Sequence, residues 1–508
     1  MKKTTLAGLA FTLVLGTTMA GAADGHFTPP EFPLPQFPTN TFNVKDFGAV
    51  GDGQTNDTPA INEVIAKCNA AGGGTVYFPA GKYSAASIHI KSNVRLLLDD
   101  NATIFGGPKE NFEKPEPNPQ WEKFQDFGHS HFHQSLMWGM NIENFAIEGG
   151  RVDGGSIGHD YYPDRGGGGD KLVTIVVGKN LLFRNVTHPK GGHFVYLLND
   201  CENITLDRVV IKESRDAVDF MGCRNVQVHD CNFTGCADDT IGVKSDYALG
   251  RKINSANFYV WDNYFESGCN GLQFGSETAG DFQNVNFWNI RIGRAMKAGI
   301  GITSNDGGVI DGVNYSNIMI KGAACPIYVL VMDRLRSGDP DKKIGRIKNV
   351  HIQDVTITDC LPGRQGPVMT AVISGLPESA VENLTLENVK IRYPGGETNR
   401  EAGNIIPPYM HGASSYSPRN LGLRPASGFY IRHVKGLTLK NVGFSFDQPD
   451  PRPTLEIFDA DGLTFDGVEA PKSALGEIVR FEKVKDLTVQ NSPGLDARQS
   501  VTVEKAAE

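Results

Sequence analysis

Short runs of alternating apolar and polar residues recur along most of the chain. In each run a polar anchor residue, usually Asn, precedes alternating apolar residues, and Asn or Asp stands at the turn that follows. Examples are CENITLDRVVI (201–211), CRNVQVHDCNF (223–233), FQNVNFWNIRI (282–292) and VENLTLENVKI (381–391). Because a period of two puts the apolar side chains on one face, these runs predict β-strands rather than helices.

The anchor residues recur at a regular spacing. They are Asn180, Asn203, Asn225, Asn257, Asn284, Gly312, Asn349, Asn383, Gly436, Gly462 and Asp486. Successive anchors are 23, 22, 32, 27, 28, 37, 34, 53, 26 and 24 residues apart. A base period of 22–24 residues with insertions is typical of a solenoid. The pattern predicts an all-β fold, a right-handed parallel β-helix with one coil per repeat. Leucine-rich repeats are the alternative, but their strict leucine pattern is missing.

One helix is expected before the repeats. Asn56 or Asp57 can cap a helix from about Thr58 to Cys68, and the glycines at 72–74 end it. Such a helix would cover the open end of the solenoid and hide its unpaired strand edge. We interpret residues 43–500 as a single β-helix domain that carries the activity.

The N-terminal segment has the features of an export signal. Two lysines, an apolar stretch and an Ala-Gly-Ala sequence at 20–22 predict a signal peptide over residues 1–22, since the apolar stretch is too short to span a bilayer. Residues 23–42 are Pro-rich and predict an extended arm. We therefore expect a periplasmic or secreted monomer without a membrane anchor. The formal net charge of −9 argues against nucleic acid as the main partner.

Eight cysteines are present, and none has the spacing of a zinc site. Cys201 and Cys223 hold equal places on neighbouring coils. They predict either a disulfide or two stacked small side chains, and the sequence leaves both open. We expect neither a metal nor a cofactor.

Polar residues recur at one offset from four successive anchors. Thirteen residues after the anchors stand His193, Asp216, Asp238 and Asn270, and Asp239 lies beside Asp238. Equal offsets stack about 4.8 Å apart in a β-helix. Clustered carboxyls do not all ionise at their ordinary pKa, so one can donate a proton while another accepts one. Paired carboxyls of this kind cleave glycosidic bonds. Two other interpretations are turn aspartates that bind backbone amides and a calcium site.

The chain resembles glycoside hydrolase family 28, the polygalacturonase-like enzymes of the pectin-lyase-like β-helices. The resemblance covers roughly residues 43–490 and is carried by DFGAVGDGQTNDTPAINEVIAKCNAAGGGTVYFPAGKY (46–83), SRDAVDF (214–220) and ADDTIGVKS (237–245). It implies that Asp238 is the general acid, that Asp216 and Asp239 hold and deprotonate a water, and that hydrolysis proceeds with inversion.

Two family motifs are altered. Where the family has Gly-His-Gly, this chain has Gly268-Cys269-Asn270-Gly271, and Gly301 and Thr303 stand at the Arg and Lys positions of its Arg-Ile-Lys motif. The motif that reads a galacturonate carboxylate is thus missing, and a carboxylate needs cationic partners.

Other side chains are candidates to contact the substrate. They are His193, Asn270, Lys244, Arg334 and Arg336, with Arg432 and His433 as further cations. Alternating histidines at 129, 131 and 133 suggest a strand with all three on one face. Long insertions between 383 and 436 and around 332–343 suggest walls of a cleft.

We therefore expect an exported glycoside hydrolase that acts on a pectin-like or other acidic polysaccharide. A polysaccharide lyase or epimerase on the same fold is one alternative. A non-catalytic carbohydrate-binding β-helix is the other.

Overall fold

The computed structural model describes residues 28–125, 128–158, 169–363 and 367–495. The chain divides into two compact units, Met1–Glu31 and Phe32–Glu508. In the first unit residues 28–31 are described and belong to no helix or strand, and the expected signal peptide lies outside the described residues. No described helix has the length and apolar character needed to cross a membrane.

The second unit is built almost entirely of strands. The first third contains β1 (Thr41–Asn43), β2 (Asp52–Asn56), β3 (Gly74–Phe78), β4 (Gly81–Ala85), β5 (Ile88–His89), β6 (Val94–Leu98), β7 (Ala102–Gly106), β8 (Ser135–Glu148) and β9 (Arg151–Asp153). The middle contains β10 (Lys171–Arg184), β11 (Thr187–His188), β12 (Phe194–Asn199), β13 (Glu202–Asp207), β14 (Val210–Ile211), β15 (Asp216–Met221), β16 (Arg224–His229), β17 (Asn232–Cys236), β18 (Ile241–Ser245), β19 (Ser255–Ser267) and β20 (Leu272–Thr278). The last part contains β21 (Phe282–Ser304), β22 (Val309–Lys321), β23 (Ala323–Val331), β24 (Arg346–Thr358), β25 (Ala371–Ser374), β26 (Val381–Gly395), β27 (Phe429–Gln448), β28 (Leu455–Asp466) and β29 (Val479–Gln490).

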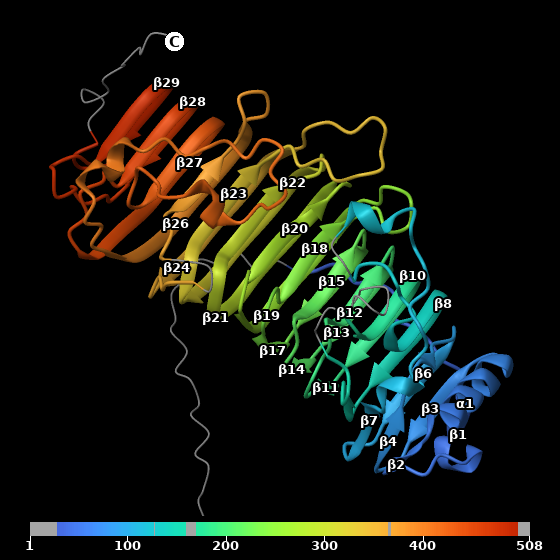
Figure 1. The fold of residues 1–508 in the computed structure, drawn as a ribbon. Coiled ribbons are helices and arrows are strands. Elements are labelled where there is room, and N and C mark those ends of the chain that lie inside the picture. Colours follow the sequence, from blue (N-terminus) through green and yellow to red (C-terminus); the bar gives the residue numbers. More distant parts are fainter. Residues whose placement is uncertain (1–27, 126–127, 159–168, 364–366, 496–508) are drawn as a thin grey trace, which may run out of the picture. The chain divides into compact units, whose positions relative to one another are not determined.

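Every pairing between these named strands is parallel, and each strand pairs with its equivalent in the next coil. Leu181 of β10 lies opposite Ile204 of β13, which lies opposite Val226 of β16, which lies opposite Phe258 of β19. These apolar side chains are fully buried and belong to one continuous core. Figure 1 shows the strands of successive coils side by side in chain order. The predicted parallel β-helix is confirmed.

The anchor residues adopt the left-handed backbone conformation. All eleven have a φ between 49° and 73°. Asn, Asp and Gly tolerate this conformation better than other residues, which explains why these three types alternate at the anchors. The asparagine side chains also form a ladder: Nδ2 of Asn203 donates to Oδ1 of Asn180 (2.8 Å), and Asn225 donates in turn to Asn203 (3.0 Å). The ladder holds the turns of neighbouring coils in register.

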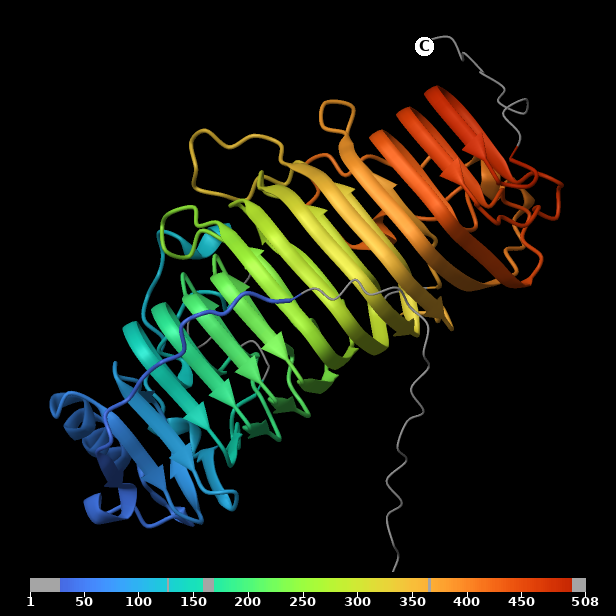
Figure 2. The same ribbon diagram turned by 180° about the vertical axis from the view of Figure 1, so that it is seen from behind.

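The expected helix is α1 (Thr58–Ala70), and its apolar face packs at the β1–β3 end of the solenoid. Asn56 accepts from the Thr58 backbone amide (3.1 Å), whereas the Asp57 carboxylate accepts from the amides of Val50 and Gly51 instead. Five short 3₁₀ helices are also described: η1 (Val44–Phe47), η2 (Lys109–Asn111), η3 (Glu122–Phe124), η5 (Arg400–Asn404) and η6 (Pro418–Leu421). Residues 32–40 form no helix or strand, and Figure 2 shows this segment running across the strands. The Phe32 ring contacts Tyr259.

All eight cysteines are free and buried. The Sγ atom of Cys201 donates to the carbonyl of Ile175 (3.4 Å), and that of Cys223 donates to the carbonyl of Leu198 (3.2 Å). Of the two interpretations that the sequence left open, this structure shows stacked thiols rather than a disulfide.

The expected strand through the three histidines is wrong. Residues 129–133 form turns before β8, and His131 has a φ of 61°, which breaks the alternation. The three histidines therefore have separate partners. His129 lies near buried carboxylates. His131 contacts the backbone carbonyl of Glu116 (2.5 Å), and His133 stacks on Trp138 (3.9 Å between ring centroids).

Candidate active site

Two turns on neighbouring coils bring Asp216, Asp238 and Asp239 to one cavity. Asp216 begins β15, and the other two aspartates come directly before β18. The cavity has a volume of about 280 Å³. Its lining residues are His129, Arg215, Asp216, Ala237, Asp238, Asp239, Lys244, Gly268, Cys269, Ser276, Lys297 and Tyr416. Cavities of similar volume lie on later coils, away from these carboxyls.

The column of side chains is shifted by one residue from the one expected. Val218 of β15 lies opposite Ile241 of β18, so Asp239 rather than Asp238 stands beside Asp216. The Asp239 backbone amide donates to Oδ1 of Asp216 (3.1 Å). The shift arises because the coil lengthens from 22 residues at the Ser214–Cys236 bridge to 23 at the strand pair that follows. A fixed offset of thirteen residues from each anchor cannot account for this one extra residue.

An arginine that the sequence analysis did not single out lies between two of the carboxyls. Arg215 Nη1 contacts Oδ2 of Asp216 (3.1 Å), and its Nη2 contacts Oδ2 of Asp238 (3.0 Å). Nη1 also lies 3.1 Å from Nε2 of His193. His193 therefore meets the site through Arg215. Arg215 lies directly before Asp216 in the SRDAVDF motif, and this position was the signal that could have identified it.

Lys244 lies beneath the carboxyls. Its ammonium is buried, 2.8 Å from Asp219, 3.8 Å from Asp239 and 3.9 Å from Asp216. These contacts make Lys244 a counter-ion within the protein. Its pKa is held well above the ordinary value, because the three carboxylates outweigh the effect of burial.

The pKa values of the aspartates are pushed apart. Burial raises the pKa of Asp239 to about 6, with Asp238 adding to the effect and Lys244 opposing it. Burial also holds the pKa of Asp216 well above its ordinary value, although Arg215 opposes this. Burial would raise the pKa of Asp219 too, but Lys244 and His129 more than offset it and keep that pKa low. Protonated and ionised carboxyls thus coexist at one pH.

Asn270 is fully buried behind Asp239. Its Nδ2 donates to Oδ1 of Asp239 (2.8 Å) and to the hydroxyl of Tyr416 (3.1 Å), and its backbone amide donates to the same carboxylate (3.2 Å). Asn270 therefore positions Asp239 and does not line the cavity itself. Tyr416 comes from the long insertion after Asn383, so that insertion does form a wall of the site.

The two arginines expected to read the substrate are directed elsewhere. Arg334 pairs with Asp306 through Nε and Nη2 (2.8 and 2.6 Å) and donates to the Ser276 carbonyl (2.7 Å). Arg336 pairs with Glu277. Neither lines the aspartate cavity. Arg432 is likewise buried against the carbonyls of Pro407 and Pro408, where it fixes the base of the long insertion.

His129 lies at the inner side of the cavity. Its ring nitrogens are 3.4 Å from Asp219, 3.5 Å from Asp246 and 3.6 Å from Glu277. Burial would lower the pKa of His129, but these carboxylates raise it to about 9. The histidine is therefore protonated at neutral pH and contributes positive charge.

Two described groups have the composition of a metal site. One is Asp238, Asp239 and Cys269, whose ligand atoms lie within 4.8 Å of one another. Burial holds the pKa of the Cys269 thiol well above its ordinary value, which disfavours the thiolate that a metal needs.

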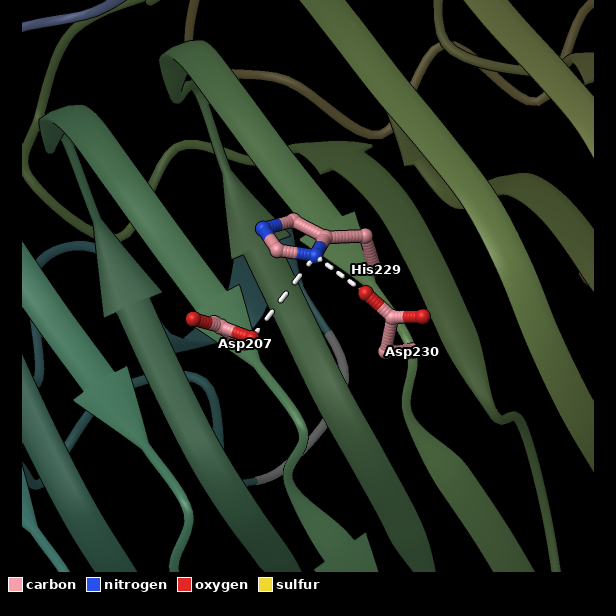
Figure 3. Close-up of side chains that lie close together, drawn as sticks. All are labelled: Asp207, His229 and Asp230. Atoms are coloured by element: carbon pink, nitrogen blue, oxygen red, sulfur yellow. Dashed lines mark hydrogen bonds and ion pairs between the residues drawn. The ribbon is translucent and has the colours of Figure 1, made fainter.

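The other group is Asp207, His229 and Asp230 (Figure 3). Asp207 is already paired with Arg184 and Arg208 at 2.7 Å each, so its charge is compensated without a metal.

The family follows from a comparison with known proteins. The model of "Glycosyl hydrolases family 28" matches residues 118–412, more than half of the chain. The chain belongs to this family. A second model, "Rhamnogalacturonase A/epimerase, pectate lyase-like", matches residues 41–112. The long segment thus carries the aspartates and the shorter one carries the capping helix.

The chain is also similar to individual proteins over part of its length. A probable polygalacturonase of Vitis vinifera is 27% identical over 296 residues, 53% of this chain and 60% of that protein. Plasmin and fibronectin-binding protein A of Streptococcus pneumoniae is 32% identical over 202 residues, 38% of this chain and 24% of that protein. The chain spans less than two thirds of the length of these relatives.

A solved structure supports the fold. The hyperthermoactive exopolygalacturonase of Thermotoga maritima superposes with a TM-score of 0.57 and 22% identity, covering 71% of this chain and 88% of that one. At this identity the likeness concerns the fold alone.

Proposed function

We propose that this protein is an exported hydrolase that cleaves glycosidic bonds in an acidic, pectin-like polysaccharide. The observation that carries the proposal is the set of three aspartates in one cavity, where burial raises the pKa values of Asp216 and Asp239. Hydrolysis needs one protonated and one ionised carboxyl at the same pH. Export rests on the sequence of residues 1–22 alone.

Each aspartate has a role in this proposal. Asp238 is the most exposed of the three, with 30% of its side chain accessible, and would protonate the oxygen of the leaving sugar. Asp216 and Asp239 are buried side by side and would hold and deprotonate the attacking water. Asn270 orients Asp239 for this task. The stereochemical result would be inversion, as the family resemblance implies.

Elimination, the reaction of a lyase, is less well supported. It needs a base that takes a proton from the sugar ring. Lys244 and Arg215 both have raised pKa values and stay protonated, because each is flanked by carboxylates. A neutral amine or guanidine is therefore not available at these two positions.

The test is product analysis on purified protein with a panel of acidic and neutral polysaccharides. We expect new reducing ends without ultraviolet-absorbing unsaturated ends, and loss of at least 1,000-fold in kcat, roughly the value of general acid catalysis and correct positioning together, in Asp238→Asn. Unsaturated ends would show a lyase. Binding of a polymer that persists in Asp238→Asn, without turnover by the wild type, would favour the carbohydrate-binding alternative.

A further inference from the structure

Four cations line the aspartate cavity, and three of them are committed to carboxylates. Arg215 bridges Asp216 and Asp238, and both Lys244 and His129 pair with Asp219. A substrate carboxylate that bound to any of these three would have to compete with an aspartate already in place. The fourth cation is different.

Lys297 lies on β21 with 7% of its surface exposed. Its backbone amide donates to the Cys269 carbonyl (2.8 Å), which places the residue directly behind the altered Gly-Cys-Asn-Gly turn. Among the residues that the structure describes, its ammonium has no hydrogen-bond or ion-pair partner. A buried ammonium without a partner is unfavourable, so a group that enters the cavity and pairs with it gains free energy.

The surrounding residues hold the Lys297 ammonium in place. It lies 3.7 Å from the centroid of the Tyr416 ring, the geometry of a cation–π contact. The Tyr416 hydroxyl accepts from Asn270 (3.1 Å), and its backbone carbonyl accepts from the Tyr328 hydroxyl (2.9 Å). The long insertion therefore fixes Lys297 from above, next to the carboxyl that Asn270 orients.

A side chain at residue 301 would require Gln273 to shift. A Cβ atom there would lie 2.1 Å from Oε1 of Gln273, which is fully buried. The Thr303 hydroxyl donates to the Phe274 carbonyl (2.9 Å) and is buried as well. Residues 301 and 303 of β21 are directed at Gln273 and Phe274 of the neighbouring strand β20, whereas Lys297 of the same strand lines the aspartate cavity.

We propose that Lys297 binds the carboxylate of an acidic sugar ring at the bond to be cleaved and so sets the preference of the site for uronates over neutral sugars. The inference rests on the proposed hydrolysis. A charge-assisted hydrogen bond in a site of low water content favours the charged substrate over its neutral ester. Lys297 and Tyr416 then do the work that the Arg-Ile-Lys motif does elsewhere in the family.

A purely electrostatic role gives a different outcome. Lys297 lowers the pKa of Asp239, opposing the effect of burial and of Asp238. If this were its only role, its loss would change the pH profile by the same amount with every substrate. A role in substrate reading changes the ratio between two substrates that differ in one charge.

The experiment compares an oligogalacturonide of defined length with its methyl ester. Lys297→Met should lower kcat/KM for the acid about 10- to 100-fold, the usual size of a charged hydrogen bond, and leave the ester within about threefold. Lys297→Arg keeps the charge and should keep the preference. Lys321 is an exposed lysine on β22, and Lys321→Met is the matched control. It should leave kcat/KM unchanged for both substrates.

Each result decides the inference. Equal losses on acid and ester, with intact thermal unfolding, would overturn it. If the wild type cleaves neither substrate, the proposed hydrolysis fails, and calorimetric binding of the same pair then decides. Acid binding at least tenfold weaker in Lys297→Met would support the reading role without catalysis. Absent or unchanged binding would overturn that role too.

Discussion

Lys244 provides the sharpest test of how the site is held together. Its ammonium lies within 4.0 Å of three buried carboxylates, those of Asp216, Asp219 and Asp239. Lys244→Met keeps the length and apolar volume of the side chain but removes the charge. Removing one partner of a buried ion pair costs about 3–5 kcal/mol, because the other charge is left uncompensated.

The magnitude can be converted to a melting temperature. The unfolding entropy is about 2.1 cal/mol/K per residue, so a unit of about 480 residues changes by about 1 kcal/mol per degree. The Tm of Lys244→Met should therefore fall by about 3–5 °C at pH 7. The exposed control Lys321→Met should stay within about 0.5 kcal/mol. Differential scanning calorimetry measures both.

The pH dependence of this loss follows from the signs of the shifts. The pKa of Asp219 is lowered in the folded protein, so its stabilising contribution is present above its unfolded pKa and is lost as the pH falls through its folded pKa. The pKa of Lys244 is raised, so its contribution is full below its unfolded pKa and is lost only at high pH. In Lys244→Met the buried carboxyls can take up protons, and the Tm difference should narrow as the pH falls from 7 to 4. A difference below 1 °C, or one that does not vary with pH, would refute the reasoning.

Three further predictions concern single side chains. Asp239 must be ionised to accept a proton, so the acid limb of kcat/KM should have an apparent pKa near 6, and a limb below pH 4.5 would contradict this role. Asn270→Ala should lower kcat about 10- to 100-fold with little change in KM, because Asp239 loses the donor that orients it, and steady-state kinetics will show whether KM moves instead. Burial raises the pKa of Glu456 to about 7, so the contribution of this residue to stability is full below about pH 4.5 and is lost as the pH rises through 7. Glu456→Gln should therefore be more stable than the wild type at pH 8, by about 1–3 kcal/mol in urea titrations, and equal to it at pH 4.

The fold could be predicted from sequence because its determinants are local. Each anchor must accept a positive φ, and the residues that do so mark each coil in the sequence. The alternation that follows each anchor fixes which side chains are buried. The three aspartates were found by the same rule, with one error: the 23-residue coil that precedes β18 places Asp239, not Asp238, beside Asp216.

The cations could not be predicted, because their roles depend on distant residues. Arg334 and Arg336 lie in an insertion, but they form ion pairs with Asp306 and Glu277 and do not line the aspartate cavity. Lys297 looks like any strand lysine until Tyr416, over 100 residues later, covers it. Arg215 lies beside a predicted catalytic residue, and only the structure shows that its guanidinium spans two carboxyls.

The charge of the substrate leads to one last prediction about substrate choice. Burial raises the pKa of Asp239 to about 6, so lowering the pH from 7 to 5 protonates the proposed base and lowers kcat/KM for the acid and the ester alike. This loss cancels in the ratio of the two values. A sugar carboxylate remains ionised over this range, since ordinary carboxyls titrate near pH 4. The ratio of kcat/KM for acid over ester should therefore stay constant from pH 7 to 5 and fall below about pH 4, where the carboxylate that Lys297 is proposed to bind takes up a proton. Competition assays with both substrates in one vessel measure the ratio directly. A ratio that does not fall below about pH 4 would mean that Lys297 does not read the charge of the substrate.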